Sequence, residues 1–167
     1  MEYTIKQLTI LGSTGSIGVN ALRVVEQHND KFDLLGLSAH SNVDKLIEQA
    51  LKYVPKAVCI VDTSKVTRLK DGLSSLNIDI YSGRDGLLEL SGRSDANFLL
   101  NAIVGSPGME PTVRAIQSSV DVALSNKESL VMAGEVINNL LEEHGTNLYP
   151  VDSEHSAIWQ CLQGENA

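Results

Sequence analysis

The stretch LTIL at residues 8–11, followed by GSTGSIG at residues 12–18, decides the fold of this chain. An apolar run of strand length leads into a glycine-rich loop, and the loop leads into a segment whose apolar residues Ile17, Ala21 and Val25 share one helical face. This order is typical of a dinucleotide-binding fold, because glycines let the backbone approach a pyrophosphate and a helix N-terminus presents unpaired N–H groups. Loops with this G-x-x-G-x-x-G spacing also occur as plain turns, so nucleotide binding and a structural turn both stay open here.

The rest of the chain continues the alternation of strands and helices. We expect further strands at residues 34–39, 57–61, 78–81, 96–104, 120–124 and 148–151. We expect helices between them at residues 43–54, 66–76, 85–90, 111–117 and 127–144. This alternation predicts an α/β fold with a doubly wound, mostly parallel sheet, as in Rossmann-like NAD(P)-binding domains. No linker precedes Pro150, so residues 1–151 are expected to form one domain and residues 152–167 to begin a second, truncated one.

The composition excludes several classes of protein. The 167 residues suit one ordinary domain, and the formal charge of −8 comes without a cluster of Lys and Arg. Nucleic acid or an anionic membrane would meet a repulsive background, so neither is expected as a partner. The first seven residues resemble neither a signal peptide nor a spanning segment, and Cys59 and Cys161 are too far apart for a metal knuckle or redox pair. We therefore expect a soluble protein of the cytoplasm.

The end of the second strand bears on the choice between NAD and NADP. An acidic residue there commonly binds the 2′-hydroxyl of NAD, but residues 38–42 read SAHSN and contain no carboxylate that would repel a 2′-phosphate. This absence favours NADP, although the usual arginine is also missing. His40 is either a contact of the 2′-phosphate or a solvated loop residue.

Residues 125–128 open the last long helix and form a candidate site. Ser125 and Glu128 fit an S-x-x-E capping box, which satisfies free N–H groups at a helix start. Lys127 places a positive charge at the positive end of the helix dipole, which costs about 0.3 to 1 kcal/mol unless an anion compensates. Lys127 is therefore a candidate for contact with a phosphate, a polarised carbonyl or a neighbouring carboxylate, with the amide of Asn126 beside it.

Residues 152–155, with the sequence DSEH, form a second candidate site. If the preceding strand continues, Asp152 and Glu154 point to the same face and can aim both carboxylates at one hard cation such as Mg²⁺ or Mn²⁺. The alternative is a helix cap at Asp152 or Ser153, with acids favoured near the helix start. His155 is more typical of a supporting or surface histidine. In a doubly wound sheet this segment, Lys127 and the glycine loop share the carboxyl edge where ligands bind.

Four motifs occur in order along the chain: GSTGSIG at residues 12–18, AIVG at 102–105, NKESLV at 126–131 and PVDSEH at 150–155. Together they resemble the 1-deoxy-D-xylulose 5-phosphate reductoisomerase family over essentially the whole chain. The resemblance implies an N-terminal NADPH-binding domain, followed in the family by a catalytic region and a C-terminal helical domain. This chain is then expected to be an N-terminal fragment of an enzyme that is a homodimer at full length, in the cytoplasm or, in a plant, in the plastid stroma.

The resemblance also implies an activity and a role for each site residue. The family is an oxidoreductase of non-mevalonate isoprenoid biosynthesis that rearranges a small phosphorylated sugar, 1-deoxy-D-xylulose 5-phosphate, and reduces it with NADPH to 2-C-methyl-D-erythritol 4-phosphate. Lys127 would be the catalytic residue and would contact substrate together with Ser153 and Glu154. Asp152 and Glu154 would hold Mg²⁺ or Mn²⁺. The residues implied to contact NADPH are Thr14, Gly15, Ser16, Ile17, Asn42, Asn126 and Glu128.

The chain departs from the family pattern in two places. Members often carry a basic residue at the tip of the second strand, where this chain has His40 and Ser41. The family's third metal carboxylate, its substrate-phosphate site, its mobile lid and most of its dimer contacts are expected after Ala167. The isolated chain is therefore not expected to complete the reaction.

Two other functions stay open from the residues alone. One is another NADP-dependent dehydrogenase domain, of the homoserine or semialdehyde type, in which residues 152–154 only cap a helix. The other is a non-enzymatic nucleotide-binding module. In such a module Ile158, Trp159 and Leu162 near the C-terminus should be ordered and covered, since they would otherwise expose apolar surface.

Overall fold

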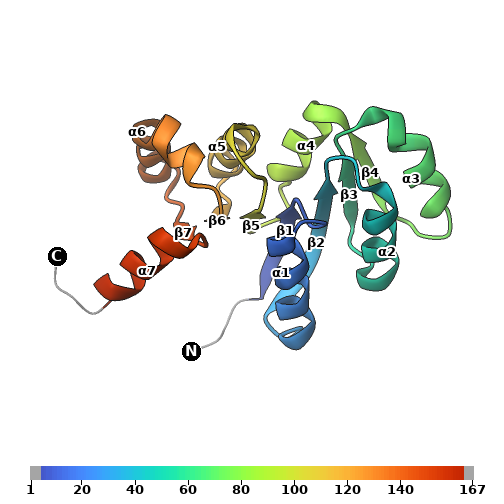
Figure 1. The fold of residues 1–167 in the computed structure, drawn as a ribbon, viewed down its shortest axis with the longest axis horizontal. Coiled ribbons are helices and arrows are strands. Elements are labelled where there is room, and N and C mark those ends of the chain that lie inside the picture. Colours follow the sequence, from blue (N-terminus) through green and yellow to red (C-terminus); the bar gives the residue numbers. More distant parts are fainter. Residues whose placement is uncertain (1–4, 164–167) are drawn as a thin grey trace.

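A computed structural model describes residues 5–163, which form an α/β domain around a parallel sheet (Figure 1). Seven strands lie in the order β4-β3-β2-β1-β5-β6-β7, and every neighbouring pair is parallel. This confirms the predicted fold class. The strands are β1 (Lys6–Leu11), β2 (Phe32–Ala39), β3 (Ala57–Ile60), β4 (Asp79–Ser82), β5 (Phe98–Asn101), β6 (Asp121–Leu124) and β7 (Leu148–Pro150).

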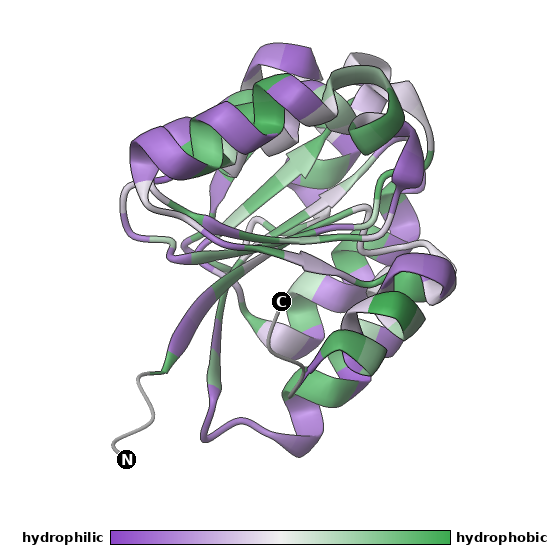
Figure 2. Ribbon diagram, turned by 90° about the vertical axis from the view of Figure 1, so that its left-hand side faces the viewer, coloured by the Kyte–Doolittle hydropathy of each residue, from purple (hydrophilic) through white to green (hydrophobic). Residues whose placement is uncertain are grey.

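Helices cover the sheet in two layers, and Figure 2 shows their apolar sides turned toward the strands. The helices are α1 (Ser16–Gln27), α2 (Val43–Tyr53), α3 (Val66–Gly72), α4 (Gly83–Ser91), α5 (Met109–Gln117), α6 (Lys127–His144) and α7 (Ser153–Leu162). Short 3-10 helices at Thr63–Lys65 and Ser106–Gly108 precede α3 and α5. Among these helices, none is long and apolar enough to cross a bilayer.

Alternation along each strand divides the core into two clusters. Leu100 in β5 and Ala123 in β6 pack with buried residues of α1, α2 and α3, whereas their neighbours Leu99 and Val122 pack with residues of α4, α5 and α6. Successive side chains of a strand point to opposite faces, so strands covered on both faces are apolar at every position. The chain order explains the two layers, because the connection from β4 to β5 crosses the sheet and reverses its direction of growth.

This reversal sets the position of the ligand edge. The chain winds outward from β1 through β2, β3 and β4, then returns to place β5 on the other side of β1. The carboxyl ends of β1 and β5 therefore lie side by side at a switch point, where helices leave the sheet in opposite directions. The glycine loop follows β1 at this point.

The strand expected at residues 96–104 is shorter than predicted. β5 ends at Asn101, and the chain leaves the sheet after a last hydrogen bond from the Ala102 N–H to the Leu11 carbonyl at 3.0 Å. The side chain of Asn101 causes the exit, because its Oδ1 accepts a hydrogen bond from the N–H of Ile103, two residues later, at 3.2 Å. The apolar composition of residues 102–104 reflects cavity walls rather than pairing with a strand.

The structure decides between the two interpretations of Asp152 and Glu154. β7 ends at Pro150, and α7 begins at Ser153 with Asp152 as its N-cap residue. Proline fits an edge strand, where its missing N–H breaks no ladder. The alternative interpretation, a helix cap at Asp152, is the one the structure shows.

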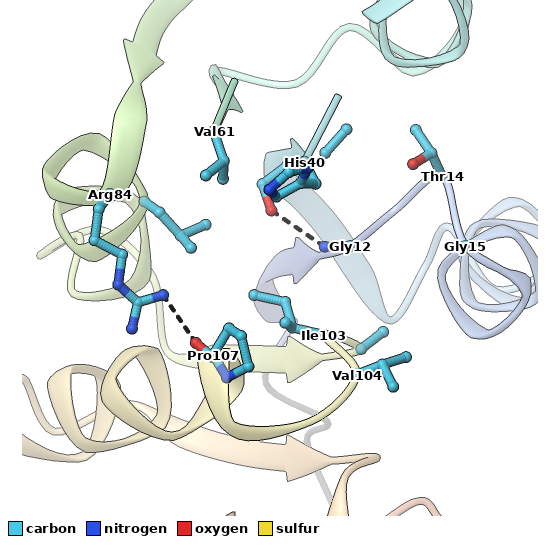
Figure 3. A pocket seen from close by; sticks show the side chains of 13 residues that line it. Gly12, Thr14, Gly15, His40, Val61, Arg84, Ile103, Val104 and Pro107 are labelled. Carbon is cyan, nitrogen blue, oxygen red and sulfur yellow. Dashed lines mark hydrogen bonds between the residues drawn. The ribbon is translucent and has the colours of Figure 1, made fainter. Parts of the chain in front are cut away.

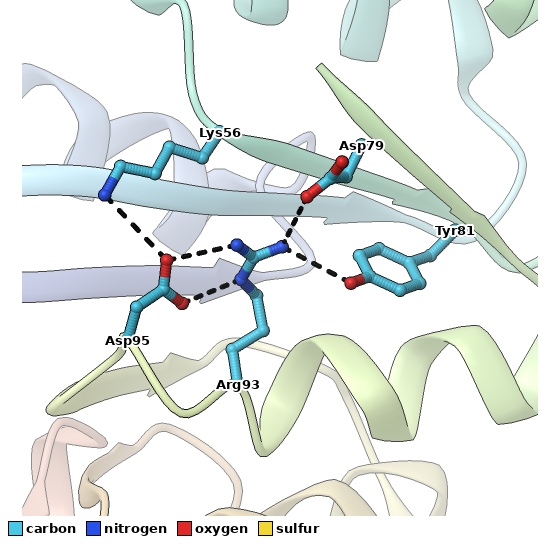
Figure 4. Close-up of polar contacts among 5 residues, drawn as sticks. All are labelled: Lys56, Asp79, Tyr81, Arg93 and Asp95. Carbon is cyan, nitrogen blue, oxygen red and sulfur yellow. Dashed lines mark hydrogen bonds and ion pairs between the residues drawn. The ribbon is translucent and has the colours of Figure 1, made fainter.

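Arg93 ties the loop between α4 and β5 to strand β4, at the end of the sheet opposite the glycine loop (Figure 4). Its guanidinium pairs with both carboxylate oxygens of Asp95, at 2.9 and 3.1 Å, and with Asp79 at the start of β4 at 3.0 Å. It also donates to the hydroxyl of Tyr81 at 3.3 Å. The Arg93 side chain is only 15% exposed, less than any other Lys or Arg side chain that forms an ion pair within residues 5–163.

We expect Arg93→Ala to lower the free energy of unfolding by about 1 to 2 kcal/mol, because a bidentate, largely buried guanidinium is lost. Arg68→Ala is a matched control: its pair with Asp44 joins side chains that are 64% and 74% exposed, and its loss should cost less than about 0.5 kcal/mol. Urea denaturation of the two variants measures both values. Equal destabilisation would contradict this assignment.

The contribution of Arg93 should also depend on pH. Hydrogen bonding to Arg93 lowers the pKa of Asp95 more than burial raises it. A lowered carboxyl pKa stabilises the fold above the unfolded value of about 3.9, and this stabilisation disappears as the pH falls through the folded value. The difference between the unsubstituted chain and Arg93→Ala should therefore be constant from pH 7 to pH 5 and shrink below about pH 4.

Candidate functional site

Close backbone contacts shape the glycine loop between β1 and α1. Gly12 has a positive φ of 73°, and a Cβ there would lie 2.9 Å from the carbonyl oxygen of Ala102. A Cβ on Gly18 would lie 2.5 Å from the carbonyl oxygen of Gly12. A Cβ on Gly15 would contact only the carbonyl oxygen of Gly12, at 3.4 Å. The fold itself therefore requires Gly12 and Gly18, whereas the space over Gly15 is open.

Ser38 at the end of β2 and Gln49 in α2 hold the loop from behind. The N–H of Ser13 donates to the carbonyl of Ser38 at 2.8 Å, and the N–H of Gly12 donates to the Ser38 hydroxyl at 3.1 Å. The buried Gln49 side chain accepts from the Ser13 hydroxyl at 2.7 Å and donates to the Ser13 carbonyl at 2.9 Å. The sequence pattern did not single out Gln49, because it lies beside the apolar stripe of α2 rather than within it.

The first turn of α1 is left without an internal anion. Gly15 is the N-cap residue, no side chain caps the helix, and its first turn contains no acid. By contrast, the side chains of Asn42, Asn126 and Asp152 cap α2, α6 and α7. Uncapped N–H groups and the helix dipole give the start of α1 a partial positive charge that suits an anion.

A cavity of about 330 Å³, here called the glycine-loop cavity, opens in front of this turn (Figure 3). The loop contributes Gly12, Thr14 and Gly15 to its wall, and the tip of β2 contributes His40. Its other walls are largely apolar, and no carboxylate lines it among the described residues. Arg84 of α4 also lines it, a residue that the sequence analysis did not single out because α4 carries no recognisable motif.

A second cavity of about 200 Å³, here called the carboxylate cavity, lies at the ends of β6 and β7. Two aliphatic residues, Ile103 and Val104, line both cavities and form a shared wall between them. The carboxylate cavity is also lined by Ile17, Ser125, Asn126, Lys127, Glu128, Asp152 and Glu154. The structure therefore brings together six of the site residues predicted from the sequence.

Two asparagines fix the shared wall through the backbone of Ile103. Asn101 accepts from the Ile103 N–H, and Asn126 donates from Nδ2 to the Ile103 carbonyl at 2.9 Å. Asn126 is buried and caps α6 by accepting from the N–H of Ser129 at 3.2 Å. The expected cap at Ser125 is wrong, because the Ser125 hydroxyl donates to the carbonyl of Asn101 at 2.9 Å instead.

Lys127 meets a carboxylate, one of the three partners expected for it. Its Nζ lies 3.3 Å from Glu154 Oε1, and both side chains are more than half exposed. The Ser153 hydroxyl donates to Glu154 Oε2 at 2.9 Å. Hydrogen bonds from the Ser153 side chain, from its own backbone N–H and from Lys127 lower the pKa of Glu154 to about 2. Glu154 is thus ionised at physiological pH, and its charge offsets that of Lys127.

Asp152 has a different neighbour, the imidazole of His155. Its Oδ1 accepts from the His155 N–H at 2.9 Å and lies 2.7 Å from His155 Nδ1. Burial raises the pKa of Asp152, but the hydrogen bonds from the His155 backbone and ring outweigh this effect and leave the pKa lowered. His155 therefore supports a carboxylate, as the sequence analysis expected of it.

Three predicted site residues line neither cavity. Ser16 is exposed at the start of α1, and Asn42 accepts from the N–H of Lys45 at 3.3 Å as the cap of α2. Ser153 is exposed and points its hydroxyl at Glu154. A binding role for these three residues would require a ligand that extends beyond the two cavities.

The donor set around the carboxylate cavity suits a hard cation in chemistry but is incomplete. Asp152 and Glu154 offer carboxylate oxygens, which Mg²⁺ and Mn²⁺ prefer. Within residues 5–163, however, no group of three or more His, Cys, Asp or Glu side chains is arranged to hold a metal ion. The structure therefore contains two candidate ligands rather than a full coordination shell.

Comparison with known proteins decides the family. The family model of 1-deoxy-D-xylulose 5-phosphate reductoisomerase matches residues 8–134, about three quarters of the chain. The chain belongs to this family. A reductoisomerase from Chloroherpeton thalassium is 51% identical over 160 residues, which cover 96% of this chain and 41% of that protein. The chain thus spans about two fifths of the length of the curated relatives it matches.

Solved reductoisomerases share the architecture. The enzyme from Zymomonas mobilis, solved in complex with NADPH, is 39% identical and aligns over 95% of this chain and 41% of its own, with a TM-score of 0.89. A second reductoisomerase, in complex with NADPH, fosmidomycin and magnesium, is 36% identical and aligns over 94% of this chain and 39% of its own, with a TM-score of 0.90. The sequence resemblance to the family is therefore confirmed.

Gly18 and Gly15 of the loop should respond differently to a methyl group. We expect Gly18→Ala to lower the free energy of unfolding by about 1 to 3 kcal/mol, because its Cβ would overlap backbone that cannot move freely. Gly15→Ala should change it by less than about 1 kcal/mol, since only one ordinary contact forms. Thermal and urea denaturation measure both. A strongly destabilised Gly15→Ala would show that this glycine serves the fold rather than a ligand.

Proposed function

We propose that this chain is the NADPH-binding part of a reductoisomerase that converts 1-deoxy-D-xylulose 5-phosphate to 2-C-methyl-D-erythritol 4-phosphate with a divalent metal. The observation that carries the proposal is the wall shared by the two cavities. Ile103 and Val104 separate an anion-accepting loop from a site with Lys127 and two carboxylates. One extended dinucleotide can occupy the glycine-loop cavity with its adenosine end and present its nicotinamide beside Lys127.

The residues present fit this cofactor. The uncapped start of α1 and the open space over Gly15 suit a pyrophosphate. The glycine-loop cavity contains no carboxylate that would repel a 2′-phosphate. The tip of β2 offers hydrogen-bond donors at His40, Ser41 and Asn42. In this assignment Thr14, Gly15, Ser16, Ile17 and Asn42 contact the cofactor. When bound, NADPH supplies the hydride for the reduction.

Asn126 and Glu128 belong to the nicotinamide end in this proposal. Asn126 acts by its position, because its amide is committed to Ile103 and Ser129 and so fixes the wall against which the ring lies. Glu128 lies exposed beside it in the carboxylate cavity, with room for a direct contact. The two residues thus shape and line the same end of the site.

Asp152 and Glu154 are proposed as metal ligands, and Lys127, Ser153 and Glu154 as substrate contacts. Bound there, Mg²⁺ or Mn²⁺ supplies a Lewis acid and a template for the oxygens of the rearranging sugar. Lys127 is the catalytic residue, since its ammonium can be released from Glu154 to a substrate oxygen when the carboxylate turns to a cation. The exposed pair in the present arrangement allows this exchange at small cost.

Family membership decides against a dehydrogenase domain of the homoserine or semialdehyde type. A non-enzymatic module is expected to have a C-terminal segment whose apolar side chains are covered. Ile158, Trp159 and Leu162 are instead 60%, 43% and 57% exposed in α7. We propose that residues 1–151 form the NADPH-binding domain and that residues 152–167 begin a catalytic region. The complete enzyme is proposed to be a cytoplasmic or plastid homodimer, without nucleic-acid or membrane partners.

The chain should bind NADPH at least about tenfold more tightly than NADH, because its cavity lacks the carboxylate that pairs with a free 2′-hydroxyl. Gly15→Ala should lower the affinity for NADPH and for NADH tenfold or more, because its methyl group takes the space of the pyrophosphate. Gly134→Ala is the matched control, because a Cβ there meets nothing within 4 Å. Fluorescence titration gives the dissociation constants. Tighter binding of NADH would overturn the proposal.

Measurements of Mn²⁺ affinity should distinguish the proposed metal ligands from the residues beside them. Asp152→Asn and Glu154→Gln should each weaken the binding of Mn²⁺ to the chain, whereas Lys127→Ala should strengthen it by freeing Glu154 and removing a repelling charge. Glu135→Gln, an exposed acid elsewhere on α6, should leave it unchanged. The signal of free Mn²⁺ in electron paramagnetic resonance measures each constant. Unchanged binding in both acid variants would contradict the metal assignment.

A further inference from the structure

Arg84 is a charged residue in the glycine-loop cavity that neither the sequence motifs nor the proposed roles explain. It is the second residue of α4, and its side chain is 38% exposed at the cavity wall. A cation near a helix N-terminus is disfavoured by the helix dipole, so this position needs a compensating interaction. That interaction comes from a neighbouring helix.

Glu110 of α5 and the carbonyl of Pro107 hold the guanidinium in place. Nε and Nη2 of Arg84 donate to Glu110 Oε2 at 2.9 and 2.6 Å. Nη1 donates to the Pro107 carbonyl at 2.8 Å, the bond drawn in Figure 3. The N–H groups of a guanidinium lie in its plane, so these acceptors contact its edges. They fix the orientation of the group and neutralise its charge with a carboxylate, so its planar face is the part that remains for a ligand.

The surroundings of Arg84 suit a flat aromatic ring. Val61 after β3, Leu87 of α4 and Pro107 also line the cavity, and Figure 3 shows Val61 above and Pro107 below the Arg84 guanidinium, both to the right of it in the view. These side chains offer apolar contact and no further charge. A phosphate gains little from a guanidinium already paired with Glu110, whereas a purine stacks on a guanidinium face and packs against aliphatic groups.

We propose that Arg84 is a cofactor-binding residue whose guanidinium, positioned by Glu110, stacks on the adenine ring of the dinucleotide. This inference rests on the proposed function, because it requires a dinucleotide in the glycine-loop cavity. It places the purine next to residues of α4 and α5. The glycine loop and the β2 tip alone do not specify where the purine binds. Arg84 then contributes to affinity for adenine but not to the choice between NADPH and NADH.

The test compares ligands that contain different parts of the dinucleotide. Isothermal titration calorimetry measures NADPH, 2′,5′-ADP, ADP and reduced nicotinamide mononucleotide against the unsubstituted chain, Arg84→Met and Arg84→Lys. Methionine keeps the aliphatic stem, and lysine keeps the charge without the planar face. Both variants should lose about 5- to 20-fold in affinity for NADPH, 2′,5′-ADP and ADP alike, and nothing for the mononucleotide. Glu110→Gln, which loosens the guanidinium, should show a smaller loss with the same pattern.

Several outcomes would overturn the inference. A loss confined to NADPH and 2′,5′-ADP would make Arg84 a contact of the 2′-phosphate, and unchanged binding of all adenine ligands would remove it from the site. An equal loss for the mononucleotide would indicate a general disturbance of the fold, which melting temperatures of the variants also report. Failure of the unsubstituted chain to bind NADPH overturns the proposed function itself. Normal binding by the Arg84 variants overturns this inference alone.

Discussion

The close approach of the glycine loop to its surroundings is the constraint on which the rest of the structure depends. A side chain at Gly12 would run into Ala102, and one at Gly18 would run into the loop itself. These contacts bring the ends of β1 and β5 and the start of α1 together at the reversal of the sheet. Gln49 and Ser38 then hold the loop so that its outer surface, over Gly15, faces open space. The close contacts of Gly12 and Gly18 on the inner side of the loop therefore leave the surface over Gly15 open to a ligand.

The charge distribution follows from the same geometry. The acids of this negatively charged chain stay out of the glycine-loop cavity, and the first turn of α1 carries none. Acids and a cation are concentrated one cavity away, where Glu154 offsets Lys127 and His155 supports Asp152. The wall between the two regions is held at Ile103 by Asn101 and Asn126. An anion-accepting region and a cation-accepting region thus adjoin on one edge, an arrangement suited to a phosphorylated cofactor beside a metal-bound substrate.

The fold could be predicted from the sequence because strand-length apolar runs and helical stripes alternate without interruption, and each is decided by neighbouring residues. The sites were harder, because they depend on contacts between distant segments. Residues 102–104 read as strand although Asn101 turns them into a cavity wall. Ser125 read as a cap because no local pattern shows that its hydroxyl is used by Asn101, and Asp152 could be either cap or strand residue. Gln49 and Arg84 carry no motif, and only tertiary packing gives them a role.

The central claim is that one dinucleotide spans both cavities across the wall at Ile103 and Val104. Nuclear magnetic resonance of the ¹⁵N-labelled chain during titration with NADPH tests it most directly, because each backbone amide reports contact separately. The account predicts shifts at Thr14 to Ile17 and at Ile103 to Gly105 that saturate together, with a smaller response at Lys127. Saturating shifts confined to the groove between α1 and α2 that Arg23, Lys45 and Lys52 line, with the glycine loop unchanged, would contradict it.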